Sequence, residues 1–125
     1  MKANCDSQTQ TVVGYVCDVS TRQGRSALKD AVDNNFGGRL DSLVNNVGTN
    51  KRAPIEDSTE EDYEVMMKSN LDSCFFLCKI FSENLSKSNG CVVNIASVAG
   101  VSSSGTGSIY AATKGAMIQL TRALA

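Results

Sequence analysis

Short runs of β-branched and apolar residues alternate with longer amphipathic stretches along this chain. The short runs lie at 12–17, 40–45 and 91–96 and have the composition of strands buried on both faces. The stretches between them repeat apolar residues at intervals of three and four, as amphipathic helices do. The alternation predicts an α/β fold, a partial Rossmann-like, doubly wound parallel sheet of three strands with flanking helices.

Capping and stop signals bound the predicted helices. Ser20 or Thr21 can cap the first helix, over about 21–35, and the Gly37-Gly38 pair that follows ends it. The longest helix, 59–86, opens at Ser58, which has capping-box spacing to Glu61. A third helix is predicted over 109–125, after a loop rich in Ser and Gly. Residues 1–11 are polar and are expected to form a flexible N-terminus, so the domain covers 12–125.

The composition excludes several kinds of catalysis and several classes of partner. The 125 residues carry 12 Lys and Arg against 13 Asp and Glu, a net charge of −1, and no His. The missing imidazole excludes Ser–His–Asp and Cys–His catalysis, and the even charge balance argues against nucleic acid or an anionic membrane as a partner. No run approaches the roughly 20 apolar residues of a membrane span.

Cysteine usage points to a reducing compartment. The five Cys residues form no CxxC pair and no even framework, so we expect reduced thiols, no metal site and a cytoplasmic location. Reactive chemistry would then depend on Tyr, Lys, Ser, Asn or carboxylate side chains.

Polar or small residues follow each predicted strand. They are Asp18 and Val19, then Asn45, Asn46, Val47 and Gly48, then Ser97. Because ligands of α/β sheets bind beyond the carboxyl ends of the strands, these residues are candidates for one binding site. Read singly, the same residues are also compatible with ordinary turns and loops.

Tyr110 and Lys114 are four residues apart and so share one helix face. An ammonium at that distance stabilises a phenolate anion, which would let Tyr110 exchange a proton with a substrate. The hydroxyl of Ser97 could hold a carbonyl oxygen beside it. No side chain donates hydride, so this chemistry would need a nicotinamide. A solvated helix face is the simpler interpretation of the Tyr–Lys pair alone.

The chain contains, in this order, Asn45-Asn46-Val47-Gly48, Asn70, Ser97 and Tyr110-Ala-Ala-Thr-Lys114. Taken together, these residues resemble the short-chain dehydrogenase/reductases, most of all their tropinone-reductase-like branch. The resemblance implies a carbonyl–alcohol oxidoreductase that uses NADP(H) rather than NAD(H), acts on a small molecule and forms homo-oligomers through helices 59–86 and 109–125. It implies a catalytic role for Asn70, Ser97, Tyr110 and Lys114. It also implies that the cofactor contacts Asp18, Val19, Asn45, Asn46, Val47, Gly48, Tyr110 and Lys114.

The family's opening Gly-rich turn, TGxxxGxG, does not occur in this sequence. The resemblance therefore implies about half of a family member, inactive alone, in which two strands between 12–17 and 40–45 are missing. We expect 12–17 to close up beside 40–45 and make a sequential three-stranded sheet, since an open slot would leave two edges unpaired. In the alternative arrangement, the space of the two missing strands stays open between 12–17 and 40–45. A second interpretation of the chain is an inactive interaction module that docks on a full-length relative.

Overall fold

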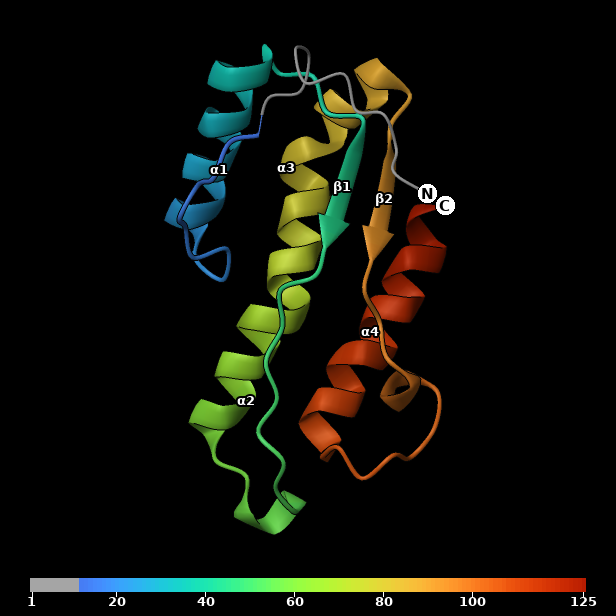
Figure 1. Ribbon diagram of the computed structural model, residues 1–125. Coiled ribbons are helices and arrows are strands. Elements are labelled where there is room, and N and C mark those ends of the chain that lie inside the picture. The colour runs from blue at the N-terminus through green and yellow to red at the C-terminus, as the bar shows by residue number, and fades with distance from the viewer. Residues whose placement is uncertain (1–11) are drawn as a thin grey trace, which may run out of the picture.

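A two-stranded parallel sheet lies in front of a layer of helices (Figure 1). The computed structural model describes residues 12–125, so the expected flexible segment 1–11 lies outside the described residues. Strand β1 (Ser42–Asn45) pairs with β2 (Cys91–Asn94) in the register Ser42 to Cys91. The parallel sheet with flanking helices confirms the predicted α/β class.

Helix α1 (Arg22–Phe36) begins and ends where its capping residues require. The Thr21 side chain accepts a hydrogen bond from the Gly24 N–H, and Gly37 ends the helix in the left-handed conformation with φ 61°. Both signals were visible in the sequence. The Asn84 amide then ties the end of α1 to α3 by donating to the Gly38 carbonyl at 2.5 Å.

A single helical rod replaces the predicted helix 59–86. It consists of α2 (Glu60–Met66), a π-helical turn η2 (Met67–Asp72) and α3 (Ser73–Ser88), and a short 3-10 turn η1 (Ile55–Asp57) precedes it. The capping box is formed by Thr59 and Asp62, one residue later than predicted. The Thr59 hydroxyl oxygen accepts from the Asp62 N–H, and the Asp62 carboxylate accepts from the Thr59 N–H. The pattern gave no sign of the π turn.

The chain after β2 turns through η3 (Val98–Gly100) and enters α4 (Ser108–Leu124). Helices α3 and α4 pack against the same face of the sheet, and their apolar side chains fill the space between the two layers. The buried cluster consists of Val19, Leu43, Cys74, Leu77, Cys78, Phe81, Leu85 and Met117.

The expected third strand is not formed. Residues 12–17 have no ladder with β1, and the Val12 and Val16 side chains are 94% and 100% exposed. The prediction that 12–17 closes up beside β1 was therefore wrong. Helix α1 packs on α3, with Leu28 and Val32 against the buried cluster, and this contact holds the preceding segment away from the β1 edge.

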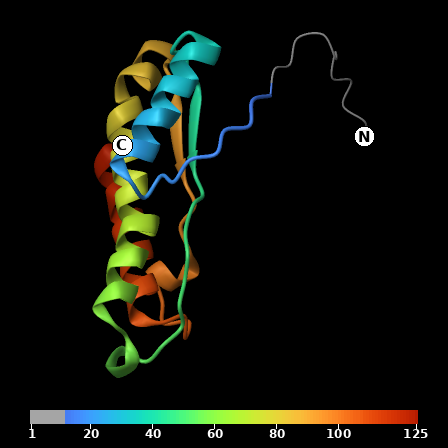
Figure 2. The same ribbon diagram turned by 90° about the vertical axis from the view of Figure 1, so that its left-hand side faces the viewer.

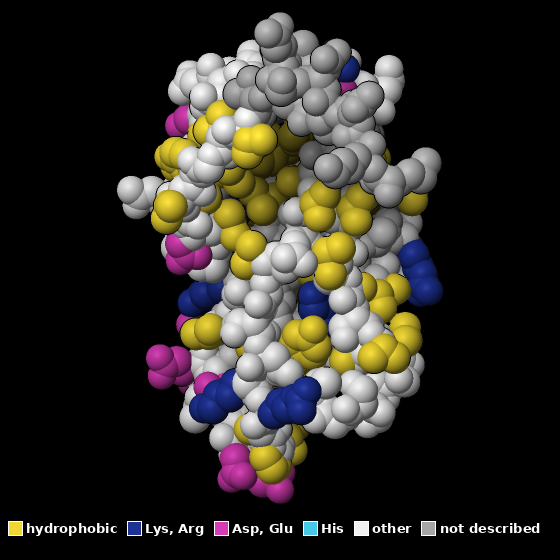
Figure 3. Space-filling model, viewed as in Figure 1, with side chains coloured by type: hydrophobic (Ala, Val, Ile, Leu, Met, Phe, Trp, Pro, Cys, Tyr) yellow, Lys and Arg dark blue, Asp and Glu magenta, His cyan; other side chains and the backbone are white. Residues whose placement is uncertain are grey.

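The opposite face of the sheet carries no helix among residues 12–125. Figure 2, turned by 90°, shows the helices on one side of the strands only. Apolar side chains gather on this uncovered face, where the space-filling view is hollowed (Figure 3). Val44 and Val93 are among the exposed apolar residues of the strands.

Candidate functional site

Asn70 lies in the π turn and is completely buried. Its side-chain oxygen accepts from the Thr49 N–H at 2.7 Å, and its amide nitrogen donates to the Thr49 carbonyl at 2.9 Å. The same nitrogen donates to the Thr113 hydroxyl at 3.1 Å. One side chain thus joins the long helical rod, the turn after β1 and helix α4. π turns inside α-helices are frequent at functional sites.

Lys114 projects from α4 and is only 4% exposed. Its ammonium donates to the Ile95 carbonyl, just beyond β2, at 2.7 Å. An ammonium has three donors, so this bond leaves capacity for a ligand. A buried ammonium with no ion pair among residues 12–125 is costly, which makes Lys114 a functional candidate on physical grounds alone.

Gly48 passes between these two side chains. A β-carbon added there would lie 3.3 Å from the Asn70 side-chain oxygen and 3.8 Å from the Lys114 ammonium nitrogen. A side chain at this position would crowd the Asn70 amide, so glycine suits the close approach of the turn after β1. The structure therefore brings Gly48, Asn70 and Lys114 together at the carboxyl end of the sheet.

Tyr110 and Lys114 share one face of α4, as their spacing predicted. The Lys114 ammonium lies 5.7 Å from the centre of the Tyr110 ring. Ser97 begins η3, where its hydroxyl oxygen accepts from the Ala99 N–H at 3.2 Å. Gly100 of the same turn packs on the backbone of Lys114 and Gly115, so η3 and α4 are in contact. The approach of Ser97 to the Tyr110 hydroxyl itself stays a prediction.

The two strand ends are joined by a pair of asparagines. The buried Asn45 amide donates to the Asn94 side-chain oxygen at 2.8 Å, and the Asn94 amide donates to the Thr121 hydroxyl at 2.9 Å. The Asn45 side-chain oxygen is buried without a hydrogen-bond partner. Asn46 and Val47, by contrast, are exposed on the turn.

Asp18 and Val19 lie in the segment that leads into α1. Val19 is buried in the core, whereas Asp18 is exposed. Hydrogen bonds from Ser20 lower the pKa of Asp18, with a smaller contribution from Arg25. The carboxylate is therefore ionised at neutral pH and able to accept a hydrogen bond. No contact described for residues 12–125 joins Asp18 to Gly48 or Lys114.

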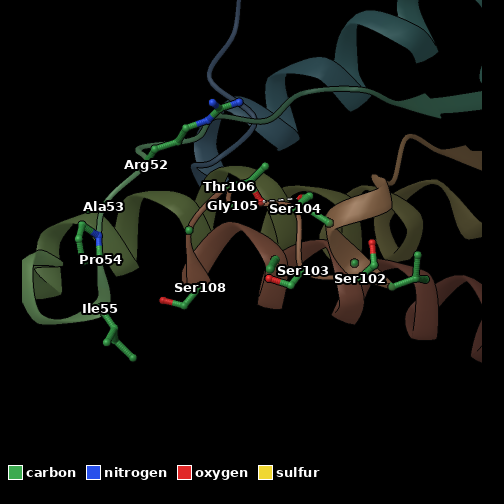
Figure 4. A pocket seen from close by; sticks show the side chains of 15 residues that line it. Arg52, Ala53, Pro54, Ile55, Ser102, Ser103, Ser104, Gly105, Thr106 and Ser108 are labelled. Carbon is green, nitrogen blue, oxygen red and sulfur yellow. Dashed lines mark hydrogen bonds between the residues drawn. The ribbon is translucent and has the colours of Figure 1, made fainter.

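A hollow of about 850 Å³ lies between the turn before η1 and the loop before α4, and it reaches Ser108 and Ala111 in the first turn of α4. In Figure 4, Arg52, Ala53, Pro54 and Ile55 form one side, and the loop from Ser102 to Ser108 forms the other. Ala99, Val101 and Ala111 add apolar surface to its lining, while four serines and a threonine add hydroxyl groups. The hollow is large enough for a small organic molecule.

Three side chains of this arrangement, Asn94, Thr113 and Thr121, were not predicted from the sequence. Thr113 holds Asn70, and Thr121 holds Asn94. Thr113 could have been suspected because it directly precedes Lys114 on the same helix. Thr121 gave no signal, since its partner is set by how α4 crosses the sheet.

Comparison with known proteins agrees with this geometry. A sequence model described as short chain dehydrogenase matches residues 1–125. Tropinone reductase homolog At5g06060 of Arabidopsis thaliana is 47% identical over 115 residues, which are 91% of this chain and 44% of that protein. Tropinone reductase homolog At1g07440 of the same plant is 44% identical over 116 residues. The chain belongs to the short-chain dehydrogenase family and spans less than half the length of these curated relatives.

Solved structures show the same fold. A short-chain dehydrogenase/reductase of Burkholderia xenovorans superposes with a TM-score of 0.85 at 31% identity, over 94% of this chain and 47% of that one. A Brucella ovis oxidoreductase of this family, in complex with a partially ordered NAD, gives a TM-score of 0.77 at 25% identity over 87% of this chain. The family resemblance of the sequence is confirmed, and the Brucella ovis neighbour is a complex with the nicotinamide cofactor NAD.

The residues present fit one end of such a cofactor. Gly48 leaves open backbone beside the free donors of Lys114, which suits the hydroxyl groups of a ribose. A pyrophosphate would need a Gly-rich turn at a helix N-terminus after an opening strand, and the sequence contains no such turn. Among residues 12–125 no cluster of three metal-ligating side chains occurs, and no helix there is long and apolar enough to cross a bilayer.

Proposed function

We propose that this chain carries the catalytic half of an NADP(H)-dependent carbonyl reductase that also runs as an alcohol dehydrogenase. The observation that carries the proposal is the convergence of Gly48, Asn70 and Lys114, with Tyr110 on the same face of α4 as Lys114. A nicotinamide bound there supplies hydride to the carbonyl carbon. The protein must then supply a proton to the carbonyl oxygen and hold both partners in place.

Tyr110 is the proposed acid. In the reducing direction its phenol O–H bond breaks and its proton goes to the carbonyl oxygen, while the electron pair of that bond stays on the tyrosine. The Lys114 ammonium, 5.7 Å from the centre of the Tyr110 ring, stabilises the resulting phenolate. Ser97 donates a hydrogen bond to the same carbonyl oxygen. In the oxidising direction the phenolate takes the alcohol proton back.

Asn70 acts by position in this proposal. Its amide is engaged by Thr49 and Thr113, so it fixes the Gly48 turn against α4 and keeps Lys114 facing the ligand. A water that passes protons from Lys114 to solvent would lie near this asparagine, as the family resemblance implies. Asp18 and Val19 would border the adenine, and Asn45, Asn46, Val47 and Gly48 would line the centre of the cofactor cleft.

We also propose a cytoplasmic location and homo-oligomers. One relative, Tropinone reductase homolog At2g29260, is named chloroplastic, so the location is a question for microscopy of a tagged protein. The outer surfaces of α3 and α4 support the oligomer, since they form a groove of about 470 Å³ lined mainly by Leu71, Phe75, Ala116 and Leu120. Exposed apolar helix faces of this kind suit contact with a second subunit.

The direct test supplies the missing half. The matching 115 residues of Tropinone reductase homolog At5g06060 would be replaced by this chain, and the chimera assayed with NADPH and NADH on a panel of ketones and aldehydes. We expect carbonyl-dependent oxidation of NADPH, faster than that of NADH. The 125-residue chain alone should bind NADP(H) weakly or not at all in calorimetry. A chimera that folds and oxidises neither cofactor, alongside an active parent, would contradict the proposal.

A second candidate is an interaction module without activity of its own. The uncovered face of the sheet favours it, because Val44 and Val93 would be buried by a partner. Copurification with a full-length relative from cells expressing both would support this role, and a chain that elutes alone would count against it.

A further inference from the structure

A second groove, which shares no lining residue with the hollow before α4, lies between α1 and α3. It encloses about 590 Å³, a size that accommodates small organic ligands. Each helix contributes three residues at positions i, i+3 and i+4, so one full helix face on each side forms a wall. These residues are Arg22, Arg25 and Ser26 from α1 and Phe76, Lys79 and Ile80 from α3.

The groove is cationic and has no carboxylate in its lining. Elsewhere among residues 12–125, five Lys and Arg side chains form ion pairs with Asp or Glu, but Arg22, Arg25 and Lys79 form none. The first turn of α1 also lacks the acidic residue that commonly neutralises the positive helix end. Three positive charges thus line one space that holds no carboxylate, and the acidic group that interacts with one of them, Asp18 with Arg25, lies outside the lining.

Arg25 fixes one of these charges in place. The side chain is 8% exposed, and one of its guanidinium nitrogens donates to the Val19 and Ser20 carbonyls at 2.8 and 2.9 Å. Its guanidinium carbon lies 4.7 Å from the centre of the Phe76 ring. Asp18, whose carboxylate acts on Arg25, is not in the groove lining. A buried, rigidly held cation attracts an anion more strongly than an exposed one.

We propose that this groove binds a small phosphorylated molecule. Arg22 and Lys79 hold a doubly charged phosphoryl group from the two walls, and the Ser26 hydroxyl donates a further hydrogen bond to it. The fixed charge of Arg25 adds attraction from the floor. Phe76 and Ile80 contact an apolar body attached to the phosphate, because the groove is larger than a bare ion requires. The proposal does not depend on the reductase chemistry above.

Binding to the 125-residue chain tests it, with phenyl phosphate and inorganic phosphate as probes and sodium chloride at matched ionic strength as reference. Phenyl phosphate at about ten times its Kd should raise the unfolding midpoint by about 4 °C or more. Inorganic phosphate should bind more weakly, because it lacks the apolar body. Amide shifts in NMR spectra should map to α1 and α3.

Matched variants separate a built site from general charge attraction. Arg22→Gln with Lys79→Gln should weaken phenyl phosphate binding at least tenfold. Lys68→Gln with Lys87→Gln removes the same charge from exposed ion pairs on the same helical rod and should leave binding unchanged. Equal weakening by both pairs, or no binding of either probe by the folded chain, would overturn the proposal. So would equal affinity for the two probes, since the apolar wall would then contribute nothing.

Discussion

The two faces of the sheet have opposite surroundings although they come from the same strands. On β1, Leu43 is 8% exposed because α3 and α4 cover it, whereas the next residue, Val44, is 57% exposed on the other face. Both side chains are apolar, as is typical of a strand that is buried on two faces. The difference shows that residues 12–125 contain the cover for one face only. The matched relatives are more than twice as long as the matched stretch, so they have the length to cover the other.

The largest effect is expected when two neighbouring side chains on β1 are each shortened to alanine. Leu43→Ala should lower the free energy of unfolding by about 2–5 kcal/mol, because it opens a cavity in the buried cluster. Val44→Ala should cost less than about 1 kcal/mol, because its side chain is mostly in water already. Urea unfolding followed by circular dichroism measures both. Similar losses for the two variants would mean that the second face is covered after all.

The covered side also carries the candidate site, and Asn70 links its parts. Asn70→Ala should lower the free energy of unfolding by about 1–3 kcal/mol, since it removes the partner of the Thr49 backbone groups and of the buried Thr113 hydroxyl. The loss should be localised, so amide exchange at Thr49 should speed up more than at residues of α1. Asn84→Ala, which loosens α1 instead, is the matched control and should leave the Thr49 amide protected.

The uncovered face should make the chain self-associate. Val44→Lys together with Val93→Lys places charge on that face and should shift the chain towards monomer in analytical ultracentrifugation. Stability should change little, because neither side chain contacts the buried cluster. If the wild-type chain is already monomeric at high concentration, the exposed apolar face does not drive association.

The free edge of β1 should give the smallest effect. The carbonyls of Asp41 and Asn45 accept from the N–H groups of Cys91 and Ile95, so the alternating backbone groups of Ser42 and Val44 point to the open side. The Val44 amide should therefore exchange with solvent faster than the Asn45 amide. Hydrogen exchange monitored by NMR compares them directly, and slow exchange at Val44 would reveal a strand paired with that edge.

Local signals in the sequence predicted the helix α1 and one face of the helix α4 correctly. Thr21 and Gly37 bounded α1, and the spacing of Tyr110 and Lys114 placed both on one face of α4. These features depend on contacts within a few residues. The strand predicted at 12–17 failed because a strand needs a neighbour, and composition alone cannot supply one. Its β-branched residues indicate a tendency, while the position of α1 against α3 determines where the segment lies.

In the candidate site, too, local patterns were visible in the sequence and contacts between distant segments were not. The pattern from Asn45 to Lys114 identified the family, and comparison confirmed it. The bonds that hold the site were not visible, because Asn70 meets the backbone of Thr49 and Lys114 meets the backbone of Ile95. Any residue type has such backbone groups, so no sequence pattern marks them. The π turn around Asn70 was hidden for the same reason.

We propose that Tyr110 is the proton donor of a carbonyl reductase. Tyr110→Phe in the chimera with Tropinone reductase homolog At5g06060 tests it most directly, with Tyr63→Phe on the exposed surface of α2 as the control. Removing only the proton-transfer group should reduce NADPH-dependent carbonyl reduction by about 10²–10⁴-fold and leave cofactor affinity nearly unchanged. Turnover that survives Tyr110→Phe at the level of the Tyr63→Phe control would contradict the claim.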